Sequence, residues 1–448
     1  MALPNWTIEL LRRSLNEVAE KARQPETIEK FKNQANEILQ DLPQTAARGI
    51  DAVMRGAESS RKSVERWTRK HTQLAVPMLN ATGVLLTDNG TGVPLADAVT
   101  EVGREVILGD CVSGHMMVDR LSRRLDRAAG NGDQHGALVM SSFEAAVASL
   151  SIFSASHTIA VHRSNCVQLS ADGGKAGLPL PSALSTIGVT LAGLKSTVME
   201  VGSSNVHSAA DFAGIERPCI VIADGGDQAI EAFDLKSPEL SGSNAIQIAI
   251  LPIATLEPSD CITSDIPVVS DWLSKVDLVV IPGNGLVGGP ESGIVMGRRD
   301  LLDVISSSIA WPVLRASEPT FAMMTVAIEI ASSKDRLPTT ALMEASQDNL
   351  KSRAERLSTR LGACDWIKSC EVTADDAKLT SRGRWTLPSR QICLRHQSKS
   401  PTAWAEELRE ELPSLFVAVG DDCVKLDLRW IRASEDAKMA EVIENLAG

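Results

Sequence analysis

The feature that most constrains the fold is a series of short, continuously apolar segments between Pro77 and about residue 310. These segments are rich in β-branched side chains, are closed by Gly, Ser, Asp or Asn, and alternate with helical stretches. Strands that crossover helices cover on both faces have this pattern, so we predict a mainly parallel α/β sheet. The predicted strands are GALVMSS, HTIAVHR, STVMEVG, CIVIADG, AIQIAIL and VDLVVIPG.

Different patterns flank this region. Before Pro77, apolar residues recur at helical spacing, as in TIELLRRSLNEVAEKA and TIEKFKNQANEILQDL. After Pro319, a long helix leads to SRQICLR, a second helix, the strand pair SLFVAVGDDCVKLDLRW and a terminal helix. The sequence therefore predicts a helical N-terminal domain over residues 1–76, a large α/β domain over 77–318 and a small α+β domain over 319–448.

Charge is distributed unevenly along the chain. The formal net charge is −12, yet the segment before Pro77 carries more basic than acidic side chains. An acidic body argues against general affinity for nucleic acid, although the basic segment could contact phosphates. In the third helix predicted for this segment, the basic side chains share one half of the helix surface. That half is either exposed to solvent or in contact with RNA. The basic residues of that face are Arg61, Lys62, Arg66, Arg69 and Lys70.

Cysteine usage and hydropathy restrict the compartment and the chemistry. The eight cysteines are scattered, with no C-x-x-C pair and no Cys/His cluster at the spacing of metal ligands. We therefore expect buried thiols and neither a metal site nor a disulfide framework. No apolar run is long enough to cross a bilayer, so we expect a cytoplasmic protein that does not enter a membrane.

Four stretches of the sequence occur in this order: PMLNATGVLLTDNGTGVPL, MEVGSSNVHSAADF, GLVGGPESGIVMGRRDLL and LFVAVGDDCVKLDLRW. Together they resemble the bacterial L-seryl-tRNA(Sec) selenium transferase family. The resemblance extends over nearly the whole chain. It implies a fold-type-I pyridoxal-phosphate (PLP) architecture, a homo-oligomer whose sites form between subunits, and an N-terminal domain that engages tRNA.

The family resemblance also locates the lysine that forms the Schiff base with PLP. In the family this lysine ends a Ser-Gly-Asp-Lys turn, and here the turn is Pro-Gly-Asn-Gly, so that Gly285 stands at the lysine position. Lys275 precedes the strand that leads to this turn and lies about 20 Å away at the opposite edge of the sheet. Lys175 and Lys195 are the remaining, remote candidates.

Other family contacts to PLP are also altered. At the turn that cradles the phosphate in the family, this chain has MSSFEAAV, where Glu144 would repel a dianionic phosphate. Leu251 stands at the place of the aspartate that contacts the pyridine nitrogen, and Asp260 could be recruited instead. Gly92 replaces an anion-binding arginine. Arg315 retains the family arginine before the small domain, either for an anion or for an ion pair.

These substitutions predict a selenium-transferase-like protein that binds no cofactor and acts by binding a partner, an RNA or a small ligand. One alternative is an active PLP-dependent transferase that uses a displaced lysine or non-covalent PLP. Another is an enzyme of unrelated mechanism that uses Asp224, Asp227, Glu144 and His207. The predicted pocket lining is Asn89, Ser141, Ser142, Phe143, Glu144, Asp224, Asn284 and Arg315.

Overall fold

In the computed structural model, Pro77–Gly448 is one of the two units into which the chain divides, and the helices expected before residue 76 lie outside the described residues. Within this unit, strands and helices are interspersed as far as residue 298, helices then follow one another to residue 361, and most of the later elements up to residue 427 are strands. The described residues are 76–87, 93–109, 122–126, 134–165, 167–168, 179–192, 198–202, 208–226, 229–237, 240, 243–258, 266–333, 337–381 and 384–447.

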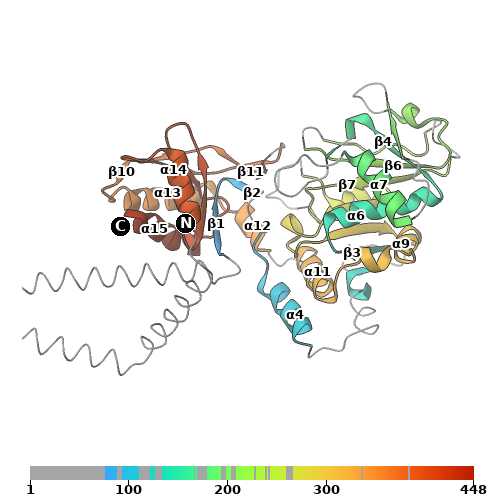
Figure 1. Ribbon diagram of the computed structural model, residues 1–448, viewed down its shortest axis with the longest axis horizontal. Helices are drawn as coiled ribbons and strands as arrows, with labels where there is room; N and C mark the ends of the chain where they lie inside the picture. The colour runs from blue at the N-terminus through green and yellow to red at the C-terminus, as the bar shows by residue number, and fades with distance from the viewer. Residues whose placement is uncertain are drawn as a thin grey trace, which may run out of the picture. The chain divides into compact units, whose positions relative to one another are not determined.

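A seven-stranded sheet forms the centre of the α/β region, in the order β3-β9-β8-β7-β6-β4-β5 (Figure 1). Strand β9 runs antiparallel to both of its neighbours, and the other neighbouring pairs are parallel. The mainly parallel sheet predicted from the sequence is confirmed. The strands are β3 (His135–Met140), β4 (Thr158–His162), β5 (Val198–Val201), β6 (Pro218–Ala223), β7 (Ile246–Ile250), β8 (Leu278–Pro282) and β9 (Gly293–Arg298).

Helices cover both faces of this sheet because its central strands are apolar on both faces. Ile248 and Val280 belong to one core cluster, whereas their neighbours Ala249 and Ile281 belong to the other, as the two-residue period of a strand requires. Helices α6 (Phe143–Ser149), α7 (Leu180–Ala192), α9 (Arg299–Ser306) and α10 (Trp311–Leu314) contribute to the first cluster. Helices α4 (Asp97–Leu108), α8 (Val269–Leu273) and α11 (Glu318–Ala331) contribute to the second.

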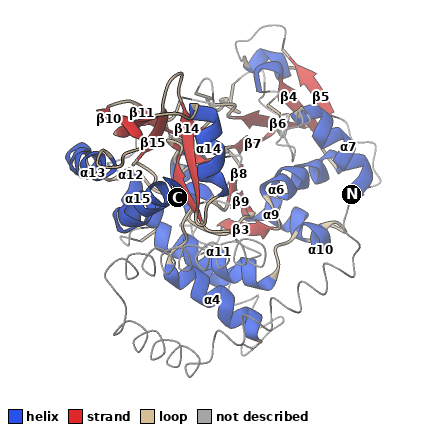
Figure 2. Ribbon diagram, turned by 60° about the vertical axis from the view of Figure 1, so that its left-hand side comes forward, coloured by secondary structure: helices blue, strands red, loops and turns tan. Residues whose placement is uncertain are grey.

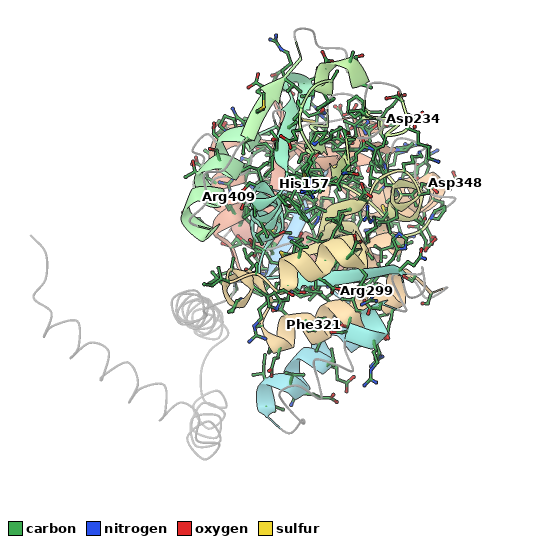
Figure 3. All side chains as sticks on the ribbon, turned by 90° about the vertical axis from the view of Figure 1, so that its right-hand side faces the viewer. His157, Asp234, Arg299, Phe321, Asp348 and Arg409 are labelled. Atoms are coloured by element: carbon green, nitrogen blue, oxygen red, sulfur yellow. A yellow bond between two sulfur atoms is a disulfide. The ribbon has the colours of Figure 1, made fainter. Side chains whose placement is uncertain are left out.

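The layers are visible in two further views. Figure 2 shows helices on either side of the red strands of the large sheet. Figure 3 shows the side chains that fill the space between the layers, with Arg299 of α9 and Phe321 of α11 labelled.

Two smaller sheets are built mainly from the C-terminal part of the chain. Strand β1 (Met78–Ala81) pairs in parallel with β14, and β2 (Val84–Leu86) pairs in parallel with β11, so the start of this unit joins its C-terminal strands (Figure 1). The other strands are β10 (Ile367–Thr373), β11 (Asp376–Thr380), β12 (Thr386–Pro388), β13 (Gln391–His396), β14 (Ser414–Val419) and β15 (Val424–Asp427), and the helices are α12 (Pro338–Met343), α13 (Gln347–Leu361), α14 (Pro401–Glu410) and α15 (Asp436–Glu444).

The elements predicted after Pro319 are present in the structure. The long helix is α11, SRQICLR forms β13, and SLFVAVGDDCVKLDLRW forms the antiparallel strands β14 and β15. The three-domain division, with boundaries at residues 76 and 318, stays a prediction.

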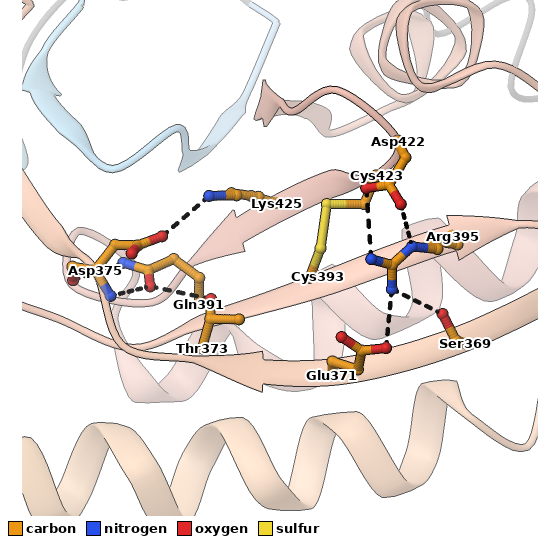
Figure 4. Close-up of a disulfide and its surroundings, with 10 residues drawn as sticks. All are labelled: Ser369, Glu371, Thr373, Asp375, Gln391, Cys393, Arg395, Asp422, Cys423 and Lys425. Atoms are coloured by element: carbon orange, nitrogen blue, oxygen red, sulfur yellow. Dashed lines mark hydrogen bonds and ion pairs between the residues drawn. A yellow bond between two sulfur atoms is a disulfide. The ribbon is translucent and has the colours of Figure 1, made fainter.

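The expectation that the cysteines are all free thiols is wrong. Cys393 in β13 and Cys423 just before β15 form a disulfide, with their Cα atoms 5.8 Å apart (Figure 4). The two residues are 30 positions apart in the sequence. The antiparallel pairing of β13 with β15 brings them together, and the spacing of the cysteines alone does not predict that pairing.

Candidate functional site

A cavity of about 670 Å³ lies at the carboxyl ends of strands β4, β6, β7 and β8. Ligands of parallel sheets bind at this edge, because the loops that follow the strands converge there. Segments that precede and follow the sheet in the sequence complete the wall. The lining residues are Leu86, Thr87, Phe143, Glu144, Ser164, Val167, Gln168, Asp224, Gly225, Ile250, Pro252, Ile253, Pro282, Asn284, Glu291, Ser292, Thr380, Ser381 and Trp385.

The loop from Gly283 to Gly293, here called the glycine turn, joins β8 to β9 at the edge of this cavity. The backbone N–H of Gly283 donates to the carbonyl of Ser292, and the N–H of Gly289 donates to the carbonyl of Gly283. A Cβ atom at Gly283 would lie 2.0 Å from Ser292 Oγ, and one at Gly293 would lie 2.3 Å from the carbonyl oxygen of Ser142. Close packing against the Ser292 side chain at Gly283, and against the Ser142 backbone at Gly293, therefore favours glycine at these two positions.

Gly285 differs from those glycines because it has space around it. A Cβ at this position would meet only the methyl groups of Leu86, at the ordinary contact distance of 3.6 Å. Its φ angle is +76°, however, which is a left-handed conformation that glycine adopts at little cost and lysine does not. The backbone at position 285 therefore has the conformation that suits a glycine.

Asp224 and Arg384 form an ion pair beside the cavity. The guanidinium donates from Nη1 to Oδ1 at 3.0 Å and from Nη2 to Oδ2 at 2.9 Å. The aspartate side chain is fully buried and that of the arginine is 16% exposed. The N–H of Gly226 also donates to Asp224 Oδ1, and the guanidinium stacks 4.6 Å from the ring centre of Trp385. This carboxylate is thus committed to partners within the protein.

At the start of α6, polar groups are used within the helix itself. Ser142 is the N-cap, and its Oγ accepts a hydrogen bond from the N–H of Ala145 at 3.0 Å. Glu144 occupies the first turn and is exposed in the cavity wall. A carboxylate at this place is favourable for the helix and unfavourable for a bound phosphate.

The structure brings together four of the predicted pocket residues: Phe143, Glu144, Asp224 and Asn284 all line the cavity. Ser141 and Ser142 lie at the adjacent turn but are not part of the lining. Of the other predicted pocket residues, Arg315 is exposed and lines a separate cavity of about 80 Å³, and Asn89 lies outside the described residues. The residues predicted as a possible RNA-contacting face also lie outside the described residues: Arg61, Lys62, Arg66, Arg69 and Lys70.

The lysine candidates are placed only in part. Lys275 precedes β8, at the amino end of the strand, and its ammonium lies 5.8 Å from the ring centre of Trp272. Lys175 and Lys195 lie outside the described residues. None of the described residues that line the cavity is a lysine.

The C-terminal part of the cavity wall was not predicted from the sequence. Trp385, Thr380 and Ser381 reach the cavity from the segment around β11 and β12, and Arg384 comes from the same segment. The stretch SRGRWT that carries Arg384 and Trp385 has no recognisable motif. Its position depends on the pairing of β11 with β2, which also places Leu86 in the wall.

The comparisons with known proteins agree with this architecture. The family model of L-seryl-tRNA selenium transferase (SelA) matches residues 257–432. The L-seryl-tRNA(Sec) selenium transferase of Moorella thermoacetica is 23% identical over 437 residues, which cover 91% of this chain and 89% of that protein. The chain resembles the L-seryl-tRNA(Sec) selenium transferases. The transferase of Geotalea daltonii is 25% identical over 309 residues, 63% of each chain.

Among solved structures, D-glucosaminate-6-phosphate ammonia-lyase superposes with a TM-score of 0.57 at 14% sequence identity. The match covers 84% of this chain and 97% of that one. The fold-type-I PLP-transferase-like architecture that the selenium transferase resemblance implies is confirmed.

The described part of the chain contains neither a group of metal ligands nor a membrane-spanning helix. No three His, Cys, Asp or Glu side chains are grouped there as metal ligands. No helix of that part has the length and hydropathy needed to span a bilayer.

Proposed function

We propose that this chain is a selenium-transferase-like protein with a degenerate PLP site, and that it acts by binding a partner, an RNA or a small ligand instead of transferring selenium. The observation that carries the proposal is Gly285, which has a positive φ angle at the position of the family lysine. Without an amine at this position the covalent link to the cofactor cannot form there.

The described lining does not fit PLP in three respects. No lysine contributes to it, and Glu144 stands where the phosphate would bind. Beyond β7, where the family has its aspartate, Leu251 is fully buried and the wall is formed by the apolar residues Ile250, Pro252 and Ile253. The neighbouring strand β6 is followed by a carboxylate, Asp224, but this carboxylate is paired with Arg384.

Reduction with borohydride tests the proposal directly. Purified protein is incubated with PLP, treated with borohydride and weighed by intact mass spectrometry, with the Moorella thermoacetica relative as the comparison. We expect no covalent PLP adduct on this chain. A stoichiometric adduct that maps to one lysine would overturn the proposal.

The alternative is an active PLP-dependent transferase that forms selenocysteinyl-tRNA from seryl-tRNA with a displaced lysine or with non-covalent PLP. The long match to the Moorella protein favours this alternative, because it covers nearly all of both chains. Peptide mapping of a reduced adduct identifies the lysine directly. An absorbance of bound PLP that survives gel filtration but leaves no borohydride adduct would favour non-covalent binding.

We also propose that the protein is a cytoplasmic homo-oligomer that contacts tRNA through its N-terminal segment. The basic residues named above would contact phosphates, so binding should weaken steeply with salt. Neutralising Arg61, Lys62, Arg66 and Lys70 together should flatten the dependence of log K on log salt. Binding of tRNA that is insensitive to salt would contradict this contact, and a monomer by light scattering would contradict the oligomer.

A further inference from the structure

The corner that follows β4 carries a histidine and a serine beside the cavity. β4 ends at His162, whose side chain is fully buried, and the 3-10 turn η3 (Arg163–Asn165) follows directly. Ser164 lies in this turn, is exposed, and is part of the cavity wall. The corner therefore places a solvent-accessible hydroxyl next to a buried imidazole at the ligand-binding edge of the sheet.

Hydrogen bonds determine which nitrogen of His162 carries the proton. The backbone N–H of Ser164 lies 3.2 Å from Nδ1, and the hydroxyl of Ser164 lies 2.8 Å from the same nitrogen. An N–H group can only donate, so Nδ1 is the unprotonated nitrogen and the ring hydrogen is on Nε2. Nδ1 is thus the acceptor that the serine hydroxyl faces, in addition to the backbone N–H.

Asp211 lies next to the other ring nitrogen of His162, the one that Ser164 does not contact. Its Oδ2 lies 3.5 Å from His162 Nε2, which is long for a hydrogen bond but close enough to stabilise a positive charge on the ring. The same oxygen accepts a hydrogen bond from the N–H of Ser208 at 3.0 Å, within a capping box. The carboxylate is therefore held in place by the start of the turn η5 (Ala209–Phe212).

The surroundings hold the imidazole in this orientation. A Cβ atom at Gly202, just after β5, would lie 2.1 Å from His162 Nε2, so only glycine leaves room for the ring. Burial lowers the pKa of His162, while the charge of Asp211 acts in the opposite direction. The ring is therefore neutral at pH 7 and able to act as a base.

We propose that Ser164 is a nucleophile and His162 its general base, in an acyl-transfer site that faces the cavity. Asp211 is a positioning residue that stabilises the protonated ring. The arrangement of hydroxyl, imidazole and carboxylate is that of a serine hydrolase, with the roles of the two ring nitrogens exchanged. This activity goes beyond the proposed function and needs no PLP.

The reaction uses an ester or thioester and water. The Ser164 oxygen bonds to the carbonyl carbon while its proton passes to His162 Nδ1. The bond to the leaving alcohol or thiol then breaks, and that proton passes to the leaving atom. Water attacks the acyl-serine by the same route, which releases the acid and restores the hydroxyl.

The charges of the wall restrict the substrate. Glu144 and Glu291 are exposed in the described lining, and no lysine or arginine contributes to it. An acyl compound with a phosphate or carboxylate would be repelled. The substrate class is therefore an uncharged or cationic ester, with an apolar part that contacts Phe143, Val167 and Ile253.

A fluorophosphonate probe tests the nucleophile, because it phosphonylates an activated serine with loss of fluoride. The full-length protein is labelled and analysed by intact mass and peptide mapping. We expect one adduct, on Ser164, which is absent in Ser164→Ala. The matched control is Ser398→Ala, which removes an exposed serine outside the cavity whose hydroxyl lies 3.4 Å from Nδ1 of another histidine, His396, and should leave the labelling rate unchanged.

Variants of the base and of the positioning residue complete the test. His162→Gln should reduce the labelling rate by about 100-fold. If this variant does not fold, Asp211→Asn provides the test, because loss of the carboxylate should slow labelling and move the midpoint of its pH profile to lower pH. The rate at which each variant hydrolyses the neutral ester p-nitrophenyl acetate should fall in the same order as its labelling rate.

Two outcomes would overturn the proposal. One is the absence of an adduct on Ser164 in folded protein. The other is a rate that is unchanged in folded His162→Gln or Asp211→Asn. Neither outcome affects the borohydride experiment, so failure of this site and failure of the proposed function are distinguishable.

Discussion

The glycine turn and the rest of the cavity wall differ in what limits the residues that can occupy them. In the turn, Gly283 and Gly293 are enclosed so closely that any Cβ would collide with neighbouring atoms. In the wall, Gly225 would meet a single methyl group at 3.3 Å, and charged side chains stand at the strand ends. The backbone path of the turn is thus restricted by packing, whereas the chemistry of the wall depends on side chains that can change without altering that path.

The largest effect is expected at the ion pair of the wall. Arg384→Ala leaves the buried carboxylate of Asp224 without its partner, so the free energy of unfolding should fall by about 3–5 kcal/mol in urea titrations. Arg124→Ala is the control, because Arg124 and Glu329 form an exposed pair whose loss should cost at most about 1 kcal/mol. Equal losses in the two variants would show that the Asp224–Arg384 pair contributes no special stability.

A smaller effect is expected in the turn. An alanine at Gly293 would place Cβ 2.3 Å from the carbonyl oxygen of Ser142 and 2.6 Å from the Cβ of Ala146, so α6 would have to move. We expect a loss of about 1–3 kcal/mol in the free energy of unfolding. Gly225→Ala is the matched substitution in the wall and should change it little. If Gly293→Ala is as stable as Gly225→Ala, the turn is not restricted by packing.

Gly285 should fall between these two glycines. Its φ angle of +76° makes alanine unfavourable by about 1 kcal/mol, although the space around it would accept a methyl group. Gly285→Asn should cost less than Gly285→Ala, because asparagine tolerates the left-handed conformation better. Chemical unfolding of both variants measures the difference in the free energy of unfolding. A Gly285→Ala variant that is more stable than Gly285→Asn would contradict the positive φ angle.

The smallest effect concerns pH. Burial lowers the pKa of His162 in the folded protein, so the unfolded chain binds more protons in mildly acidic solution. The contribution of neutral His162 to the free energy of unfolding is complete above about pH 6.5, the pKa of a histidine in the unfolded chain. This contribution is lost as the pH falls through the lower pKa of His162 in the folded protein. In His162→Gln the decline in unfolding free energy between pH 7 and 5 should be shallower than in the unmodified protein. Identical declines would contradict a lowered pKa for His162.

Much of the fold could be predicted because its signals are local. The six apolar runs became β3 to β8, and their continuous apolarity was enough to indicate helices on both faces of the sheet. The chain resembles the selenium transferases along most of its length, and that resemblance located Gly285 at the turn.

The candidate site was predictable only in part. Phe143, Glu144, Asp224 and Asn284 follow strands or begin a helix, and such positions converge at one edge of a parallel sheet. Arg384 and Trp385 have no such signal, whereas Ser164 follows β4 in the same way and was not predicted. Arg315, which follows the same reasoning from the family, instead lines the smaller cavity.

The sequence by itself determined the strands, the helices, the glycine turn and the absence of a lysine at position 285. Local backbone conformation and burial are properties of neighbouring residues, so they can be read from a short stretch of chain. Only the tertiary structure decided that Asp224 meets Arg384, that Cys393 meets Cys423 and that Asp211 stands behind His162. Those contacts join segments that lie apart in the sequence, and their formation depends on the packing energy of the whole unit and not on any pattern within one segment.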